Sequence, residues 1–421
     1  MIVRARVILP LCQPPIENGA VVIAGKCIVA VGHWRDLKSH GGEVFDLGDS
    51  IVLPGLINAH CHLDYTDMAG MIPPRKSFSS WIKALLALKA AWSYSEYAQS
   101  WINGAKMLLR TGTTTVADIE AVPELLPEVW SATPLRIGSL LELTGVKSRR
   151  SPKELLNGAA QKIESLHDTK SFAGLSPHAL YSTSPELLQR CGKIGRIKNW
   201  LLSTHVAESQ EEDEMFVHSR GALFNWLKTQ RDMSDCGKFS PVEQLARYQL
   251  LSDKFLAVHA NYISENDAAL LSQSQSSVVH CPRSHEYFGH RKFPYERLTK
   301  AGVNICLGTD SLASVAKKPH QTIELNMFAE MQSFAKQNPA VSAQTILQMA
   351  TQNGAAALGM NQHIGRVSPR YRADLIALPF AGKFSEAYEA TLHHPDTVSA
   401  SMVEGQWAVR GDFPGSLLKN T

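Results

Sequence analysis

The stretch PGLINAHCHLD, residues 54–64, is a short apolar segment that ends in two histidines, His60 and His62. Alternate side chains of a β-strand point to the same face, so the two imidazoles converge while Cys61 points to the opposite face. Convergent imidazoles suit a divalent metal ion, because neutral ring nitrogens are common zinc ligands. The stretch therefore predicts a strand that carries part of a metal site, with Asp64 just behind it.

Further short apolar segments follow, with helical stretches such as 78–92 and 97–109 between them, and TGTTT at 111–115 ends one helix and starts the next strand. This alternation predicts βα units and a parallel sheet. Eight units fit a (β/α)8 TIM barrel, an α/β fold that takes roughly 250 residues and forms active sites where its strands end. The eight expected strands end near His62, Asp118, Glu142, His178, His205, His259, Cys281 and Asp310.

The two ends of the chain differ from this middle part. The amino-terminal segment contains the β-rich runs ARVILP, AVVIAG and CIVAVG, separated by turn residues. The carboxy-terminal segment contains ADLIALPF and TVSASMVEGQWAV, in which Gly405 is the expected turn glycine. Both ends together predict one small sheet domain.

Composition excludes several classes of protein. The 421 residues carry a formal net charge of +3, with 44% hydrophobic and 19% charged residues, and no long block of like charge that would indicate nucleic-acid binding. Seven scattered cysteines without a C-x-x-C pair predict reduced thiols in the cytoplasm. The apolar run at the amino terminus is too short for a signal peptide, and no run of about 18 apolar residues predicts a membrane span.

Three more strand ends carry residues that complete a metal site. His205 and Glu208 follow the run WLLST, His259 ends FLAVH, and Asp310 ends ICLGTD. A single histidine at a strand end is more often a hydrogen-bonded structural group. Histidines and an aspartate at four strand ends together match a catalytic zinc site with an open coordination position.

The motifs PGLINAHCHLD, THVAES, VHAN, HCPRS and LGTDS, in this order, resemble the amidohydrolase superfamily. They are most similar to its branch of triazine hydrolases, guanine deaminases and adenosylhomocysteine, methylthioadenosine and aminodeoxyfutalosine deaminases. The resemblance implies a barrel over 55–364 and a β-sandwich made of 1–54 and 365–421. A homodimer is expected by analogy only.

The resemblance also implies a role for each residue. His60, His62, His205 and Asp310 would bind the metal, and Asp310 would also accept a proton from the attacking water. Glu208 would carry protons to the ring nitrogen and to the leaving amine. His259 would orient the hydroxide and stabilise the tetrahedral intermediate.

Substrate contacts are expected from three further residues, each with a structural alternative. His178 would contact the substrate or cap the barrel rim. Glu142 would bind a ribose or another polar group, or pair with Arg149 or Arg150. Trp81 matches a helix that relatives place over the pocket, and core packing is its ordinary role.

The loop from Arg283 to His290 departs from the better-known relatives, which carry Ser-Asn after the HCP motif. Arg283, His285 and His290 are expected at the mouth of the pocket, where they would bind an anionic or polyhydroxy substrate. A structural network within the loop is the alternative. If these residues bind the substrate, they favour aminodeoxyfutalosine, because that nucleoside carries a carboxylate.

Two other metal motifs fail. HEYFGH, residues 285–290, places its second histidine five residues after the first, whereas a zincin helix needs four. The P-C-x-x-C of cytidine deaminases is absent. Relatives with two metals use a lysine at the end of the fourth strand, and SFAGLSPH has none, which favours one ion. Zinc is expected, and iron or manganese would accept the same ligands.

Three functions are consistent with these patterns. The first is hydrolytic deamination of an aminated heterocycle, above all an aminopurine nucleoside, as a small-molecule substrate. The second keeps the site and hydrolyses a chloro- or aminotriazine or a cyclic amide. The third, a non-catalytic binding barrel, conflicts with the complete set of expected ligands together with Glu208 and His259.

Overall fold

Eight parallel strands form the barrel, in the order of the sequence. The computed structural model describes residues 1–73, 77–146, 148–318, 320, 322–395 and 397–410. The barrel strands are β6 (Leu56–Cys61), β7 (Thr113–Glu120), β8 (Arg136–Leu143), β9 (Phe172–Pro177), β10 (Leu202–Val206), β11 (Phe255–His259), β12 (Ser277–His280) and β13 (Ile305–Leu307). Each strand ends within three residues of its expected position, so the predicted TIM barrel is confirmed.

The barrel closes between its first and last strands. Cys61 and Asp310 form a parallel bridge, and the Thr309 N–H donates to the His60 carbonyl over 3.0 Å. Gly308 permits this approach, because a Cβ at its position would lie 2.8 Å from the His60 carbonyl oxygen. The closure therefore sets His60 and Asp310 side by side.

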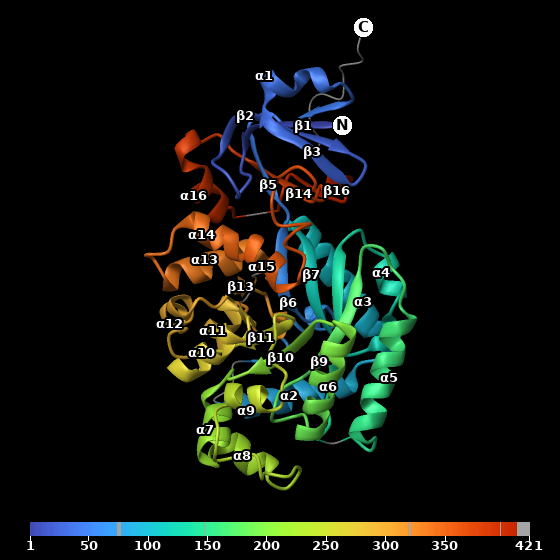
Figure 1. The fold of residues 1–421 in the computed structure, drawn as a ribbon, viewed down its shortest axis with the longest axis vertical. Coiled ribbons are helices and arrows are strands. Elements are labelled where there is room, and N and C mark those ends of the chain that lie inside the picture. Colours follow the sequence, from blue (N-terminus) through green and yellow to red (C-terminus); the bar gives the residue numbers. More distant parts are fainter. Residues whose placement is uncertain (74–76, 147, 319, 321, 396, 411–421) are drawn as a thin grey trace.

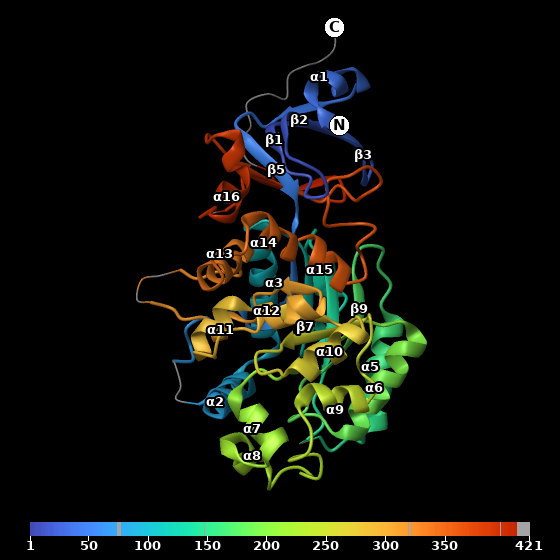
Figure 2. The same ribbon diagram turned by 60° about the vertical axis from the view of Figure 1, so that its left-hand side comes forward.

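Helices cover the outside of the barrel, as Figures 1 and 2 show. A capping box of Ser93 and Glu96 starts α3, and the chain turns at Gly112 into β7, as the TGTTT segment predicts. The helices of this region are α2 (Phe78–Ala91), α3 (Tyr94–Arg110), α4 (Glu128–Ser131), α5 (Pro152–Ser165), α6 (Pro185–Lys198), α7 (Gln210–His218), α8 (Gly221–Leu227), α9 (Pro241–Arg247), α10 (Glu265–Gln273), α11 (Pro282–Phe288), α12 (Tyr295–Ala301), α13 (Met327–Gln337), α14 (Ala343–Met349) and α15 (Gln352–Ala357).

A second eight-stranded sheet joins both ends of the chain. Its strands are β1 (Ile2–Ile8), β2 (Ile16–Ala24), β3 (Cys27–His33), β4 (Val44–Asp46), β5 (Ser50–Pro54), β14 (Leu375–Pro379), β15 (Ala400–Val403) and β16 (Gln406–Arg410), with α1 (Trp34–Leu37) and α16 (Ala387–Leu392) beside them. Short 3-10 helices complete the described chain: η1 (Lys38–His40), η2 (Leu63–Met68), η3 (Pro123–Leu125), η4 (Leu312–Ser314) and η5 (Phe384–Glu386).

This terminal sheet has its own core. Antiparallel pairing of β5 with β14 links the two ends of the chain. Phe45 of β4 lies against Trp407 of β16 with ring centroids 5.5 Å apart, so the sheet curls around buried apolar residues. The β15–β16 turn uses Glu404 and Gly405 with φ of 49° and 77°, as a two-residue hairpin requires. The separate β domain is confirmed, while the boundaries at 54/55 and 364/365 stay predictions.

Arg136 holds the terminal sheet against the barrel. It begins β8, is buried, and donates to Asp374 and, over 3.1 Å, to Glu404. The terminal sheet therefore covers the amino ends of the barrel strands and leaves their carboxyl ends free for a site (Figure 1). Among the residues that the structure describes, no helix has both the length and the apolar character that a bilayer crossing requires.

Candidate active site

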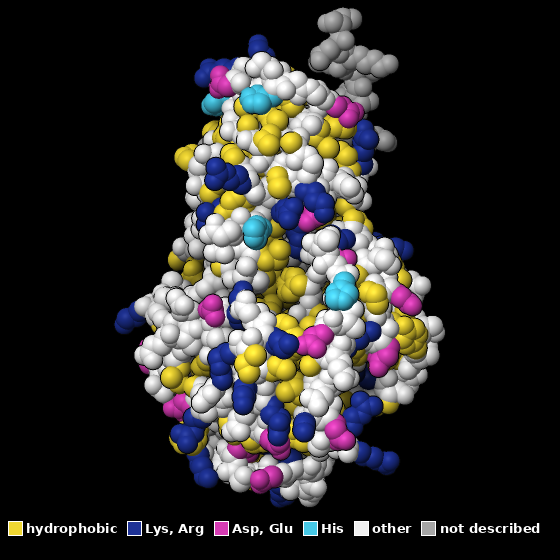
Figure 3. All heavy atoms as spheres, turned by 45° about the vertical axis from the view of Figure 1, so that its right-hand side comes forward, with side chains coloured by type: hydrophobic (Ala, Val, Ile, Leu, Met, Phe, Trp, Pro, Cys, Tyr) yellow, Lys and Arg dark blue, Asp and Glu magenta, His cyan; other side chains and the backbone are white. Residues whose placement is uncertain are grey.

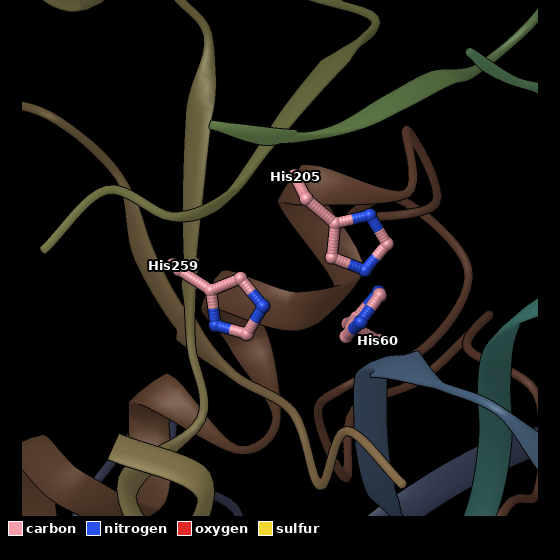
Figure 4. Close-up of side chains that lie close together, drawn as sticks. All are labelled: His60, His205 and His259. Atoms are coloured by element: carbon pink, nitrogen blue, oxygen red, sulfur yellow. The ribbon is translucent and has the colours of Figure 1, made fainter. Parts of the chain in front are cut away.

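Histidines from three barrel strands converge at the carboxyl ends of the strands. Figure 4 shows the rings of His60, His205 and His259 turned toward one another. One ring nitrogen from each lies within 4.8 Å of the others, and His60, His62 and Asp310 form a second group with the same spacing. The residues that the sequence places at separate strand ends thus meet at one point.

Short distances connect the two groups. The Nε2 atoms of His62 and His205 are 3.4 Å apart. Oδ1 of Asp310 lies 3.7 Å from Nε2 of His60 and 3.6 Å from Nε2 of His62. These separations suit side chains arranged around one ion rather than bonded directly to each other.

Unusual backbone directs several of these side chains inward. His259 and Asp310 have φ of 72° and 53°, and Ala207, just before Glu208, has φ of 50°. Such left-handed conformations cost energy for residues other than glycine and are concentrated at functional sites. The barrel holds them because the neighbouring strands fix the chain on both sides.

The imidazoles fit a divalent cation. Within the described chain, both ring nitrogens of His60, Nδ1 of His62 and Nε2 of His259 are buried without a hydrogen-bond partner. Burial lowers the pKa of His62 and His259 to about 3, so both rings are neutral at pH 7 with a lone pair free. A cation among them would satisfy buried polar atoms that otherwise cost free energy.

Asp310 is oriented by two serines. Its Oδ2 accepts hydrogen bonds from Ser284 Oγ at 2.7 Å and from Ser314 Oγ at 2.8 Å, which leaves Oδ1 toward the histidines. Burial opposes ionisation of Asp310, but the neighbouring imidazoles of His60, His259 and His62 outweigh it and lower the pKa of Asp310 well below its ordinary value. The side chain is therefore an anion facing the imidazoles.

Glu208 lies beside this cluster and is almost fully buried. Its Oε1 is 3.6 Å from Nε2 of His259. Burial, with Asp310 and Glu212 nearby, raises the pKa of Glu208 well above its ordinary value. The carboxyl group can therefore hold a proton near neutral pH and release it to a base in the cavity.

These groups form the floor of a cavity of about 270 Å³. Aromatic and aliphatic side chains of α2 and α8 make much of its wall, and polar groups lie on the side of β8 and β9. The lining residues are His62, Tyr65, Phe78, Trp81, Ile82, Leu85, Leu86, Lys89, Glu142, Thr144, Val146, His178, Tyr181, Ser182, His205, Glu208, Trp226, Leu227, His259, Asp310 and Ser311. The structure thus provides a half-open, mainly apolar cavity with polar groups at its floor.

The polar wall contains two residues expected from the sequence. Nε2 of His178 lies 3.9 Å from Oε1 of Glu142, and its Nδ1 bonds Ser182 Oγ at 2.7 Å. The basic partner of Glu142 is Lys89 at 3.5 Å, in place of the arginines considered from the sequence. Burial opposes ionisation of Glu142, but Lys89 and His178 outweigh it and lower its pKa to about 2.

Sequence reasoning missed Lys89. Its ammonium group lies 4.6 Å from the Tyr65 ring centroid and faces the cavity from α2. A signal exists in the sequence, because Phe78, Trp81, Ile82 and Leu85 mark one face of a helix at i, i+3, i+4 and i+7, and Lys89 continues that face. A lysine at the end of an apolar stripe indicates a cation at the edge of a pocket.

Trp81 is packed in the protein and also lines the cavity. It lines the cavity, its ring lies 5.0 Å from that of Phe288, and its Nε1 donates to the Ala313 carbonyl over 3.4 Å. The indole is therefore fixed by packing and still presents a surface to the cavity.

Arg283 and His285 lie away from the cavity lining. Arg283 pairs with Glu330, whose Oε2 accepts its backbone N–H at 2.9 Å, and its guanidinium donates to the Glu324 carbonyl over 2.9 Å. Nδ1 of His285 bonds Oδ1 of Asn261 at 3.0 Å. The structure therefore gives both residues partners within the protein, as the alternative of a structural loop network has it.

Figure 3 shows basic and acidic side chains mixed over one face of the molecule, with apolar side chains in a hollow near its middle. On this face no single sign of charge dominates, whereas a polyanion-binding surface would gather lysines and arginines. The size of the cavity, about 270 Å³, suits a small molecule.

Known proteins resemble this chain in sequence and in fold. The family model described as "Amidohydrolase family" matches residues 51–408. A 5-methylthioadenosine/S-adenosylhomocysteine deaminase of Syntrophobacter fumaroxidans is 30% identical over 381 residues, which cover 86% of this chain and 80% of that protein.

Two solved structures resemble the fold. An aminofutalosine deaminase of Helicobacter pylori in complex with methylthio-coformycin has a TM-score of 0.85 at 24% identity, over 97% of this chain and 100% of that one. An atrazine chlorohydrolase of Arthrobacter aurescens TC1 complexed with zinc has a TM-score of 0.83 at 20% identity, over 97% and 95% of the two chains. From the extent of the family match and the 30% identical relative, the chain belongs to the amidohydrolase family.

Proposed function

We propose that this chain is a metal-dependent hydrolytic deaminase of an aminopurine nucleoside. The observation that carries the proposal is the buried Glu208 carboxyl group, 3.6 Å from His259 at the floor of the cavity and beside the histidine and aspartate cluster. Removing an amine from a heterocycle requires a group that can both give and take a proton next to the attacked carbon. The deaminase names among the relatives support the same reaction.

His60, His62, His205 and Asp310 would hold one divalent cation, for which zinc is our first candidate, with iron or manganese as alternatives. When bound, the cation lowers the pKa of a water molecule toward about 7 and so supplies hydroxide at neutral pH. The unpartnered ring nitrogens of His60 and the free Oδ1 of Asp310 support this assignment.

The remaining work falls to side chains of this chain. Asp310, an anion with Oδ1 facing the cluster, accepts the proton of the attacking water. Glu208, with its raised pKa, protonates the ring nitrogen as the tetrahedral carbon forms. It then accepts the proton of the new hydroxyl group as the C=O bond forms and passes it to the amine, which leaves as ammonia. The proton held by Asp310 then returns Glu208 to its protonated form. Neutral His259 orients the attacking hydroxide toward the carbon. It then hydrogen-bonds the hydroxyl group of the tetrahedral intermediate and stabilises it.

The cavity favours a flat heterocycle with a polar substituent. Trp81 and its apolar neighbours supply a surface for a ring, and Glu142, His178 and Lys89 supply acceptors and donors for sugar hydroxyl groups. An adenosylhomocysteine-like or methylthioadenosine-like nucleoside and aminodeoxyfutalosine are the candidates. The preference for aminodeoxyfutalosine rested mainly on a contact between Arg283 and the substrate carboxylate. Arg283 is instead paired with Glu330 and lies away from the cavity lining, so this argument no longer supports the preference.

The test is ammonia release from a panel of aminopurine nucleosides by the metal-replete protein. The wild type should release ammonia from at least one, and Glu208→Gln should be slower by about 10²- to 10⁴-fold. Glu214→Gln, on the exposed side of α7, is the matched control and should keep wild-type activity. Chloride release from a chlorotriazine without ammonia from any amine would instead favour a halide hydrolase.

The free thiols support a proposal on the cellular location. All seven cysteines are free, which supports a reducing compartment. We therefore propose a cytoplasmic enzyme, and fractionation of cells that express the full chain tests this.

A further inference from the structure

We infer that Asn261 and His285 are positioning residues that hold Glu208 in its working orientation, an inference that rests on the proposed function. His285 donates to Asn261, and Asn261 donates to the backbone of Glu208. Both side chains are buried and neither lines the cavity, and the hydrogen bonds that run from His285 through Asn261 end on Glu208.

Two turns after neighbouring barrel strands are bonded to each other here. The N–H of Ala260 donates to the Val206 carbonyl over 3.0 Å, and the N–H of Asn261 donates to the Ala207 carbonyl over 2.9 Å. Ala207, His259 and Ala260 all have positive φ, so both turns are held in costly conformations. Side-chain hydrogen bonds to the backbone of such turns are needed to keep the turns in one conformation.

Glu208 receives such contacts on both of its peptide groups. Its N–H donates to Oε2 of Glu212 over 2.8 Å, and its carbonyl accepts Nδ2 of Asn261 at 2.9 Å. With both peptide planes fixed, the Cα–Cβ bond of Glu208 has one direction, toward His259. Loss of either contact frees a peptide plane and lets the carboxyl group move from its place.

The amide of Asn261 has only one orientation that satisfies its neighbours. The Glu208 carbonyl can only accept, so the NH2 group of Asn261 must face it and Oδ1 must face His285. Nδ1 of His285 must then carry the hydrogen. His285 therefore supplies the second anchor of the amide, and a residue without a donor at this position would leave Oδ1 of Asn261 unbonded and the amide held by the Glu208 carbonyl alone.

His285 is itself fixed by packing. Its ring lies 5.2 Å from that of His280 and 5.4 Å from that of His290, and only 4% of the residue is exposed. This position, behind the turn that carries Glu208, explains why a histidine expected to contact the substrate lies outside the cavity lining.

The test compares His285→Phe, His285→Asn and Asn261→Asp with the wild type. Phenylalanine keeps the ring without a donor, whereas asparagine places an NH2 group where Nδ1 stands. Asn261→Asp keeps the shape but turns a carboxylate toward the Glu208 carbonyl. The matched control is His394→Phe, another buried histidine, whose Nε2 bonds the Thr397 carbonyl at 3.1 Å.

We expect kcat to fall about 10- to 100-fold in His285→Phe and Asn261→Asp, as for other residues that orient a functional group, with KM within twofold. His285→Asn should recover most of kcat, and His394→Phe should leave both constants unchanged. Crystal structures should show the distance between Glu208 Oε1 and His259 Nε2 lengthened in His285→Phe and close to 3.6 Å in His285→Asn.

Unchanged kcat in folded His285→Phe, or equal loss in His285→Phe and His285→Asn, would overturn the inference. So would an unmoved Glu208 side chain in the His285→Phe crystal structure, a result that needs no substrate. A wild type that releases no ammonia while His285→Phe still displaces Glu208 would refute the proposed function and leave the positioning role standing.

Discussion

Glu212 gives a prediction that links the site to stability. It is fully buried in the first turn of α7, and its Oε2 accepts the N–H of Glu208. Burial raises the pKa of Glu212 from 4.5 to about 8, more than the backbone N–H groups of Glu208 and Ala207 lower it. The folded protein therefore binds this proton in a pH range where the unfolded chain releases it.

Proton linkage gives the direction in which the free energy of unfolding changes with pH. Between pH 4.5 and pH 8 the folded state holds more protons at Glu212 than the unfolded state does, so the free energy of unfolding decreases as pH rises. The slope approaches about 1.4 kcal/mol per pH unit for one proton. From pH 5 to pH 7, Glu212 should therefore remove about 2–3 kcal/mol of stability.

Glu212→Gln removes this titration and keeps an oxygen for the Glu208 N–H. Urea unfolding at pH 5, 6, 7 and 8, followed by tryptophan fluorescence, gives the difference between the variant and the wild type. The variant should gain about 2–3 kcal/mol over the wild type between pH 5 and pH 7.

Ser209→Ala is the control for the Glu212 prediction. Ser209 caps α7 by accepting the Glu212 N–H over 3.2 Å, and its loss should cost about 1 kcal/mol at every pH. A pH-independent difference between Glu212→Gln and the wild type would refute the reasoning, because it would mean that Glu212 carries the same charge in both states.

Three further predictions concern the fold and the cavity. Arg136→Met should lower the free energy of unfolding by about 3–5 kcal/mol, because Asp374 and Glu404 lose a buried cation; a loss below about 1 kcal/mol in urea titration would contradict this. Trp81→Leu should raise KM about 3- to 10-fold through loss of about 0.5–1.5 kcal/mol of aromatic contact with the substrate, and an unchanged KM in steady-state kinetics would exclude that contact. Chelation should abolish ammonia release and zinc should restore it, whereas full activity in metal-free protein, checked by elemental analysis, would contradict a metal-dependent reaction.

The sequence alone determined the barrel and the gathering of polar strand ends. Parallel strands all carry their carboxyl ends to one face, so His205, His259 and Asp310 could be assigned to a common site without knowledge of any contact between them. The alternation of apolar segments and helices is a local property, and residues that follow a strand by one or two positions keep their place relative to it. The roles of these residues stay proposals.

Only the tertiary structure decided which partner each charged group has. Arg283 could face the cavity or the protein, and it pairs with Glu330 on α13, 47 residues away in sequence. Lys89 meets Glu142 across 53 residues, and His285 reaches Asn261 across 24. The packing of helices around the barrel decides which groups come within about 3 Å of a side chain, and the side chain bonds to those groups. Local sequence patterns do not predict that packing.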